Sequence, residues 1–350
     1  MQPLICTQKV RGSNPLSPTN STFHQQHKQM AIIVYLDQSI LSNLVKLRRG
    51  EIKSPGVKGA YSQLFDAIES CNRKGCHVFP ESMYHRLEAQ FDSRLSDDER
   101  RYLREISRGL EFEHPSQIVN IQMERALDQY LHYEEHQRVW WEDIFNRDPH
   151  EPWTPEPYKV DVRFVLSPNI TEHDRSGKNL LPRLLKKIAP ITSARTLEQQ
   201  TELERKALIS LLFIPSKPDV SDTSIGGLAR INDYVEVWSR YEYLKGRGLS
   251  TPDIASFLQS QELASIPMVD IEAKLRGHLM VNLARRAPRG SDREDIEIMA
   301  MTLPYCHIVT TDSYMQKVVV EDLKLANSYR TTVLSCKLKD IEKLTVMLAN

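Results

Sequence analysis

The feature that most constrains this fold is an apolar run that ends abruptly at a carboxylate. Residues 31–36 read AIIVYL, and Asp37 follows them directly. Beyond Asp37, the apolar residues Ile40, Leu41 and Leu44 recur at helical spacing. A short, fully apolar segment that runs straight into a helix is typical of a buried strand in a parallel sheet. The sequence therefore predicts a strand at 31–36, a helix at 38–48 and a carboxylate between them.

The same alternation of strand and helix continues to residue 92 and returns after residue 290. In the first part we expect helices at 60–74 and 81–92 around a strand at 76–79, with Gly75 ending the first helix. In the second part we expect helices at 291–303, 313–325 and 338–348 and strands at 306–311 and 331–336. This order predicts an α/β fold, a parallel sheet flanked by helices.

The intervening residues 93–288 have a different, mostly helical character and predict a large insertion in the α/β domain. Ser96 and Glu99 form a capping box that opens one helix. Several prolines between Pro149 and Pro157 predict a linker or extended loop. The expected elements are helices at 96–111, 116–146, 177–189, 194–213, 226–246, 251–261 and 267–286, with a strand at 160–166.

Residues 1–29 are polar and contain no acidic residue. One interpretation is a disordered tail. The other is a spurious extension before a true start at Met30, because Gly12-Ser13-Asn14-Pro15 is what the common T-arm sequence of a transfer-RNA gene encodes. The expected organisation is an N-terminal extension at 1–29, an α/β domain formed by 30–92 and 289–350, and a helical insertion at 93–288.

Composition excludes several classes of protein. Lys and Arg total 46, as do Asp and Glu, so nucleic acid would have to bind at a local patch. No apolar run approaches the ~20 residues of a membrane span. The five cysteines form no recognisable zinc pattern, which favours reduced thiols in a cytoplasmic protein. No HExxH, Walker or GxGxxG motif is present, which argues against zinc hydrolases and nucleotide-driven or dinucleotide chemistry.

Carboxylates recur where the predicted strands end. Asp37 and Asp312 each follow a strand, Asp295 opens the helix before the strand at 306–311, and Glu88 lies in the helix after the second strand. The carboxyl ends of parallel strands share one edge, so we expect these four groups to meet there. Clustered carboxylates repel one another unless a cation neutralises them. Mg²⁺ or Mn²⁺ prefers such oxygen ligands and supports phosphodiester hydrolysis.

Three segments together resemble the PIN-like nuclease family: YLDQSIL (35–41), FPESMYHRLEAQ (79–90) and SDREDIEIMAMTLPYCHIVTTD (291–312). The resemblance covers residues 30–92 and 290–336. It implies a PIN-like fold and metal-dependent hydrolysis of RNA, or sometimes DNA, to leave a 5′-phosphate. It also implies that Asp37, Glu88, Asp295 and Asp312 hold the metal and carry the catalysis, and Ser39 matches the family's small polar residue. The long insertion departs from the compact members of the family.

Alternatives remain at several of these positions. Glu81 competes with Glu88 as the second acid, and Asp292 competes with Asp295. Asp37 and Asp312 can also act simply as helix N-caps, since Asp is favoured there.

The substrate and partners are also only partly specified by the sequence. Ser39 and Thr310 are expected to line the pocket, and Arg285, Arg286 and Arg289 to hold phosphates. The expected partner is RNA rather than DNA, in a toxin or phage-defence setting. The insertion would close over the site, restrict substrate, or bind a protein partner or a second copy. A catalytically inactive RNA-binding or scaffold module is the competing function. A haloacid-dehalogenase-type phosphohydrolase ranks low because it needs an Asp where Ser39 stands.

Overall fold

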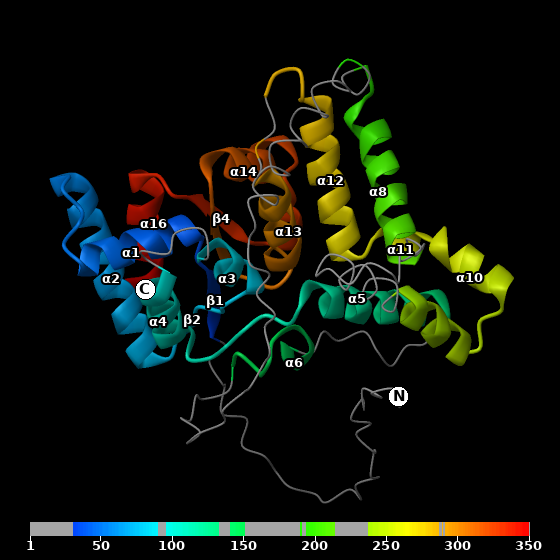
Figure 1. Cartoon of the computed structure of the whole chain (residues 1–350), viewed down its shortest axis with the longest axis horizontal. Coiled ribbons are helices and arrows are strands. Elements are labelled where there is room, and N and C mark those ends of the chain that lie inside the picture. The colour runs from blue at the N-terminus through cyan, green and yellow to red at the C-terminus, as the bar shows by residue number, and fades with distance from the viewer. Residues whose placement is uncertain are drawn as a thin grey trace, which may run out of the picture.

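The computed structural model describes residues 31–89, 96–132, 141–150, 190, 194–213, 237–286, 289 and 291–349. The N-terminal 29 residues, the strand expected at 160–166 and the helix expected at 177–189 lie outside these ranges. Where residues are described, the α/β class expected from the sequence is confirmed, with a parallel sheet among helices (Figure 1).

The sheet has four parallel strands in the order β2-β1-β3-β4. They are β1 (Ile32–Tyr35), β2 (His77–Val78), β3 (Ile308–Thr311) and β4 (Thr332–Ser335). The chain adds β2 on one side of β1, and then places β3 on the other side, with β4 beyond it. The strand order therefore reverses between β1 and β3, which is the topological switch point where open α/β sheets bind ligands.

One face of the sheet is covered by helices from both ends of the α/β domain and by the first helix of the insertion. Their buried side chains, with Val34, Ile308 and Leu334 of the sheet, form one hydrophobic cluster. The sequence predicts this because each helix has an apolar stripe at helical spacing. These helices are α1 (Gln38–Arg48), α2 (Pro55–Lys74), α4 (Ser96–Ser107) and α16 (Leu338–Ala349).

The opposite face packs against α13 (Asp292–Thr302) and against helices of the insertion. Ile33, Tyr35 and Val309 of the sheet share a buried cluster with Ile118 of α5 (Pro115–Tyr130) and Ile271 of α12 (Pro267–Val281). The insertion therefore contributes to both cores of the α/β domain. Shorter helices complete the layer: α3 (Met83–Ala89), α6 (Trp141–Ile144), α14 (Ser313–Lys317), the π-helix η2 (Val318–Asp322) and α15 (Leu325–Tyr329).

The rest of the insertion lies beside this layer and has a small core of its own (Figure 1). It comprises α8 (Leu197–Phe213), the helical residues 237–246, α10 (Thr251–Leu258) and α11 (Gln261–Ala264). Helix α12 contacts α8 on one side and α13 on the other, so it joins the insertion to the α/β domain. None of the described helices is both long and apolar enough to cross a membrane.

Several helices are shorter than their sequence patterns predict. The single helix expected at 116–146 is wrong, because α5 ends at Tyr130 and His132 adopts a left-handed backbone (φ 59°) before α6. The helix expected to reach residue 111 ends at Ser107 for the same reason, with Arg108 at φ 52° and Gly109 at φ 72°. The helix expected at 313–325 divides into α14 and η2, and α15 follows. A left-handed residue interrupts the hydrogen-bond ladder even where apolar periodicity continues.

Candidate active site at the carboxyl edge of the sheet

Asp37 and Asp312 lie on either side of the switch point, because each follows one of the two strands that flank it. Each is also the N-cap of the next helix. Oδ1 of Asp37 accepts a hydrogen bond from the Ser39 amide (2.8 Å), and Oδ1 of Asp312 accepts one from the Met315 amide (2.7 Å). Oδ2 of Asp312 lies 3.9 Å from an Arg289 nitrogen. Capping therefore engages one oxygen of each carboxylate and leaves the second for another partner.

Asp295 completes a group of three aspartates that act on one another electrostatically. Burial, followed by the charges of Asp312, Asp37 and Asp292, raises the pKa of Asp295 to about 7. Burial is also the main cause that raises the pKa of Asp37, with a contribution from Asp312, although hydrogen bonds from Ser39 oppose the shift. The three side chains therefore lie close enough to interact through their charges, and burial together with this interaction makes the charged forms of Asp295 and Asp37 costly.

The three aspartates suit a hard cation, but they are not a closed cage. Among the His, Cys, Asp and Glu residues that the structure describes, only Cys71, Cys76 and His77 place three possible metal-binding atoms within 4.8 Å of one another. The aspartate oxygens are more widely spaced. Mg²⁺ usually keeps several waters and takes only one or two carboxylates directly, so a wide, all-oxygen site fits it. Asp37, Asp295 and Asp312 are the residues that would hold such an ion.

Thr310 fixes the position of Asp37. Its hydroxyl donates to the Tyr35 carbonyl oxygen (3.2 Å) and accepts a hydrogen bond from the Asp37 amide (2.6 Å). The side chain is 1% exposed, so Thr310 joins the ends of β1 and β3 rather than facing the pocket as predicted. Ser39, also predicted to line the pocket, is exposed, and its hydroxyl contacts Asp37 Oδ1.

A buried network beneath Asp37 was not apparent from the sequence. The Tyr35 hydroxyl lies 3.0 Å from Ser82 Oγ, and the Ser82 amide donates to Nδ1 of His85 (3.1 Å). Nε2 of His85 therefore carries the proton and donates to the Leu36 carbonyl oxygen (2.7 Å). Burial lowers the pKa of His85 to about 4, which keeps the ring neutral. The network holds the last residues of β1 in place just before Asp37.

Cys336 is a second unexpected neighbour of the site. Its Sγ lies 2.8 Å from Ser39 Oγ and 3.7 Å from Asp37 Oδ1. Burial, then the charge of Asp37, raises the pKa of Cys336 to about 12, so it stays a thiol. Its position directly after the last strand was the available signal, because that places it at the same sheet edge.

The two candidates for the second acid lie in different surroundings. Glu81 precedes α3 and pairs with Arg86 (3.7 Å); its other charged neighbours are Glu111, Arg104 and Arg100. No aspartate of the site is among them. Glu88 is half-buried within α3, and its charge, after burial, helps to raise the pKa of Tyr35 well above its usual value. Glu88 is thus the candidate nearer the end of β1.

Of the remaining predicted residues, Asp292 and Arg286 bind each other, whereas Arg285 and Arg289 are exposed. Asp292 is 4% exposed and accepts two hydrogen bonds from the Arg286 guanidinium (2.6 and 2.7 Å) and one from the Arg289 amide (2.6 Å). Arg286 also stacks over the Tyr314 ring at 3.7 Å. The hydrogen bonds between Arg286 and Asp292 hold the turn before α13 together. Arg289, 67% exposed and beside Asp312, and exposed Arg285 remain open to a phosphate.

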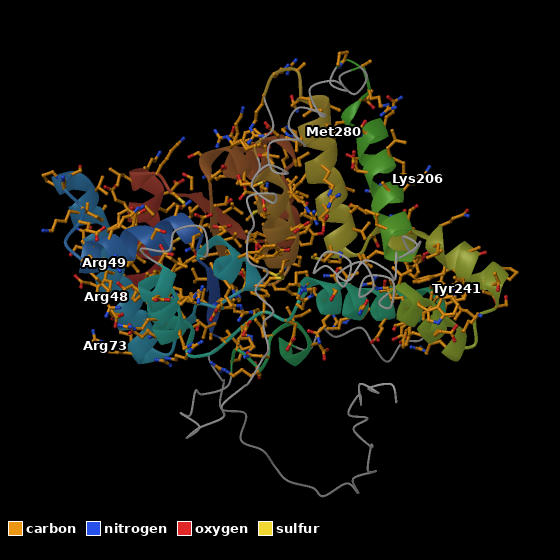
Figure 2. All side chains as sticks on the ribbon, viewed as in Figure 1. Arg48, Arg49, Arg73, Lys206, Tyr241 and Met280 are labelled. Carbon is orange, nitrogen blue, oxygen red and sulfur yellow. The ribbon has the colours of Figure 1, made fainter. Side chains whose placement is uncertain are left out.

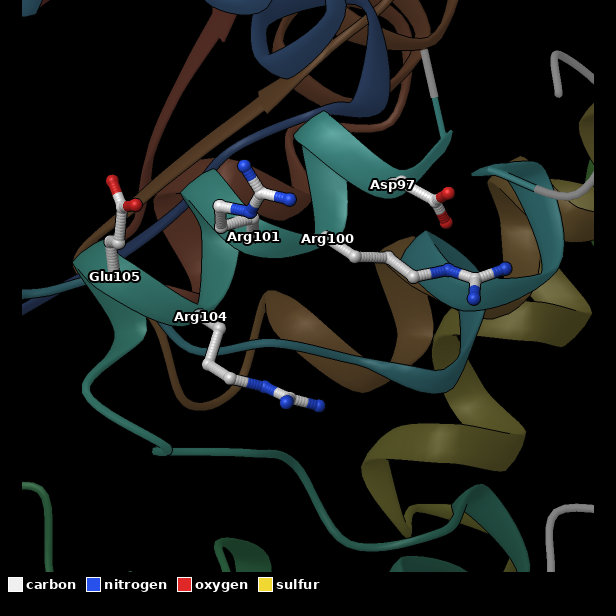
Figure 3. A pocket seen from close by; sticks show the side chains of 5 residues that line it. All are labelled: Asp97, Arg100, Arg101, Arg104 and Glu105. Carbon is white, nitrogen blue, oxygen red and sulfur yellow. The ribbon is translucent and has the colours of Figure 1, made fainter. Parts of the chain in front are cut away.

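Arginines on α4 form a cationic surface that was not predicted. Arg100, Arg101 and Arg104 are exposed and pair with no acid among the residues that the structure describes. Neighbouring Arg48, the last residue of α1, and Arg49, its C-cap, do pair with acids of α4 (Figure 2). The first turn of α4 packs on α1, because Gln38 and Ser42 donate to Glu99. A hollow on this surface is lined by Asp97, Arg100, Arg101, Arg104 and Glu105 (Figure 3).

Comparison with known proteins identifies no relative. No protein-family model matches the chain, and neither a curated protein nor a solved structure does so. The function therefore has to be argued from the site itself.

Proposed function

We propose that this protein is a Mg²⁺- or Mn²⁺-dependent endonuclease with a PIN-like fold that hydrolyses RNA in preference to DNA. The observation that carries the proposal is that Asp37 and Asp312 follow the two strands that flank the switch point, and that burial, then the charges of Asp312 and Asp37, raises the pKa of Asp295 to about 7. A site that makes three carboxylates repel one another is expensive unless a cation binds there. The bound ion would supply an activated water and stabilise charge on the phosphate.

The roles of the protein's own residues follow from their contacts. Thr310 and the Tyr35–Ser82–His85 network hold the end of β1, and so fix Asp37. Asp295 releases its proton when positive charge arrives, because the cation removes the repulsion that favours the neutral form. Exposed Arg289 lies beside Asp312 and is placed to hold a substrate phosphate. Glu88 is the candidate fourth acid.

The test is cleavage of end-labelled single-stranded RNA and DNA with Mn²⁺, with Mg²⁺ or with EDTA. The variants are Asp37→Asn and Asp312→Asn, in which Asn keeps the helix cap because it caps as well as Asp. The matched control is Asp253→Asn, which makes the same chemical change in the first turn of α10. We expect metal-dependent cutting that falls on the order of 10²-fold or more in the site variants and stays unchanged in the control.

Each other outcome has a definite meaning. Equal cutting by wild type and both site variants would show that these aspartates are not the site. Absence of cutting with every metal, together with retained RNA binding, would favour the inactive RNA-binding or scaffold module. Calorimetric titration with Mn²⁺ then decides whether the carboxylates hold a metal at all.

A further inference from the structure

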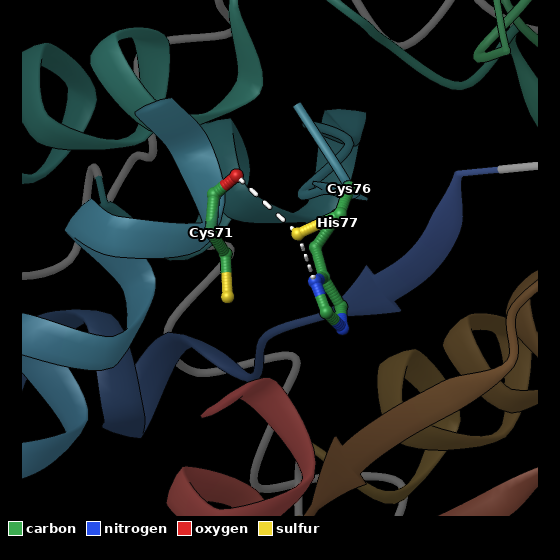
Figure 4. A group of neighbouring side chains, drawn as sticks. All are labelled: Cys71, Cys76 and His77. Atoms are coloured by element: carbon green, nitrogen blue, oxygen red, sulfur yellow. Dashed lines mark hydrogen bonds between the residues drawn. The ribbon is translucent and has the colours of Figure 1, made fainter. Parts of the chain in front are cut away.

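A separate cluster of possible metal ligands lies at the opposite, amino edge of the sheet. Cys71 is in the last turn of α2, Gly75 ends that helix in the left-handed conformation (φ 72°), and Cys76 and His77 lead into β2. The tight turn at Gly75 brings Cys76 back beside Cys71. Figure 4 shows the Cys76 thiol facing the His77 ring, with Cys71 alongside.

The spacing of the donor atoms is close to that of a metal site. The two sulfurs and a ring nitrogen of His77 all lie within 4.8 Å of one another, and Nδ1 of His77 is 3.2 Å from Cys76 Sγ. Two sulfurs bound tetrahedrally to Zn²⁺ at ≈ 2.3 Å would lie about 3.8 Å apart. Side-chain rotations that move the sulfurs by roughly 1 Å therefore suffice to close the site around an ion of this size.

The cluster is largely buried but can be reached from solvent. Cys71 is 1% exposed and His77 is 3% exposed, while half-buried Cys76 provides access from solvent. Nε2 of His77 is buried without a hydrogen-bond partner, so no hydrogen bond at that atom fixes the tautomer of the ring. The thiols form no disulfide; that of Cys71 donates to the Leu348 carbonyl oxygen (2.8 Å), and that of Cys76 donates a long hydrogen bond to the Cys71 carbonyl oxygen (3.8 Å). A metal at Nδ1 would fix both the tautomer and the ring orientation.

We propose that Cys71, Cys76 and His77 bind one Zn²⁺ ion, with water in the fourth position. Two thiols and an imidazole are soft to borderline ligands, which select Zn²⁺ over Mg²⁺ or Mn²⁺. Binding releases the two thiol protons to solvent and replaces the hydrogen bond from Cys71 to Leu348. The ion links the end of α2 to the start of β2, so it stabilises the edge of the sheet where the strand is shortest.

This site does not depend on the proposed nuclease activity. Cys76 and His77 lie at the amino end of β2, whereas Asp37 and Asp312 follow the carboxyl ends of β1 and β3. A zinc site here can exist in a protein with or without a functional acidic site. If both sites hold ions, EDTA removes the ions from both. Cleavage must therefore be restored by adding Mn²⁺ alone before the activity is assigned to the aspartates.

The test uses the full-length, chemically reduced protein under anaerobic conditions, titrated with Zn²⁺ against a competing chromophoric chelator. Co²⁺ serves as a spectroscopic probe in a parallel titration. We expect one ion per chain, visible bands of tetrahedral Co²⁺ with sulfur-to-metal charge transfer, and a rise in thermal midpoint with Zn²⁺. Cys76→Ala and His77→Ala should each weaken binding at least tenfold.

The matched control is Cys306→Ala, which removes another buried cysteine, one that belongs to the hydrophobic cluster on the opposite face of the sheet from Cys71 and Cys76. It should bind Zn²⁺ as wild type does. Circular dichroism of the metal-free variants checks that each is folded, and a variant that fails this check is replaced by Cys76→Ser. Lack of stoichiometric uptake by folded wild type, Co²⁺ spectra without sulfur ligation, or equal losses in Cys306→Ala and Cys76→Ala would each overturn the proposal.

Discussion

At the scale of single residues, Asp37 and Asp312 each cap a helix and still present a carboxylate at the edge of the sheet. Oδ1 of each accepts the capping hydrogen bond, which orients the carboxylate at the sheet edge. The two interpretations that the sequence left open are therefore compatible. The cap even helps function, because it restricts the rotamers of the carboxylate.

The raised pKa of Asp295 predicts an unusual dependence of stability on pH. Its carboxyl titrates at about 7 in the folded protein, against 3.8 for the ordinary value. The folded state therefore binds this proton more tightly, so the stability that Asp295 contributes is fully present below pH about 4 and is lost as the pH rises through 7. Asp295→Asn cannot lose a proton, so it should be more stable than wild type at pH 8 by on the order of 2 kcal/mol.

Chemical denaturation in chelator at pH 5 and pH 8 measures this difference. The wild type should lose more unfolding free energy between these values than Asp295→Asn does. The control Asp253→Asn should keep the wild-type slope, since hydrogen bonds from Ser250 lower the pKa of Asp253 and it titrates below this range. Parallel pH curves for wild type and Asp295→Asn would contradict the assigned electrostatics.

At the scale of secondary structure, the contact between α8 and α12 requires a glycine. A Cβ on Gly277 would lie 2.7 Å from Thr201 Oγ1 and 3.0 Å from the Thr201 backbone. Because backbone atoms cannot rotate out of the way, the two helices would have to separate. This contact keeps the insertion against α12, and through α12 against the α/β domain.

Gly277→Ala should therefore destabilise the protein by about 1–3 kcal/mol, although Ala favours a helix more than Gly does. The matched control is Gly59→Ala in α2, where a Cβ would meet nothing within 4 Å. That change should stabilise the protein by about 0.5–1 kcal/mol. Thermal or urea unfolding followed by circular dichroism measures both changes, and effects of the same sign at the two positions would refute the packing argument.

At the scale of the whole molecule, charge has to be distributed unevenly if the protein is to bind RNA, because its formal net charge is zero. The exposed arginines of α4, which line one hollow together with Asp97 and Glu105, are one local concentration of positive charge. Helix α4 lies against α1, whose first residue follows Asp37. A strand of RNA held on α4 would thus lie beside the helix that begins at the acidic site.

The double variant Arg100→Glu with Arg104→Glu should weaken binding of single-stranded RNA at low salt by about tenfold or more. Loss of two phosphate contacts should also reduce the slope of log K against log salt by about 1.4. The control is Lys206→Glu in α8, labelled in Figure 2, with Lys245→Glu in the helical residues 237–246, an equal change of charge away from α4. Fluorescence anisotropy across a salt series measures both, and an equal loss in the two double variants would show only a net-charge effect.

The helices and strands near the site were predictable because short stretches of sequence specify them. The run before Asp37, the helix at 38–48 and the end of α2 at Gly75 follow from apolar periodicity and glycine conformation, and all are observed. The parallel sheet follows from the alternation of strands and helices. The end of α5 was missed because apolar periodicity continues past Tyr130, while the left-handed backbone of His132 depends on its surroundings.

The sequence by itself thus determined the class of fold, and it predicted that Asp37, Glu88, Asp295 and Asp312 lie at the carboxyl edge without deciding between Glu81 and Glu88 or between Asp292 and Asp295. Only the tertiary structure decided what each candidate touches. It buried Thr310 beneath Asp37, engaged Arg286 with Asp292, separated Glu81 from the aspartates and placed His77 beside two thiols. The physical reason is that strand order and helix packing join residues far apart in the chain, and burial then sets the electrostatics of each group. No short stretch of sequence specifies which distant residues meet or how deeply each is buried.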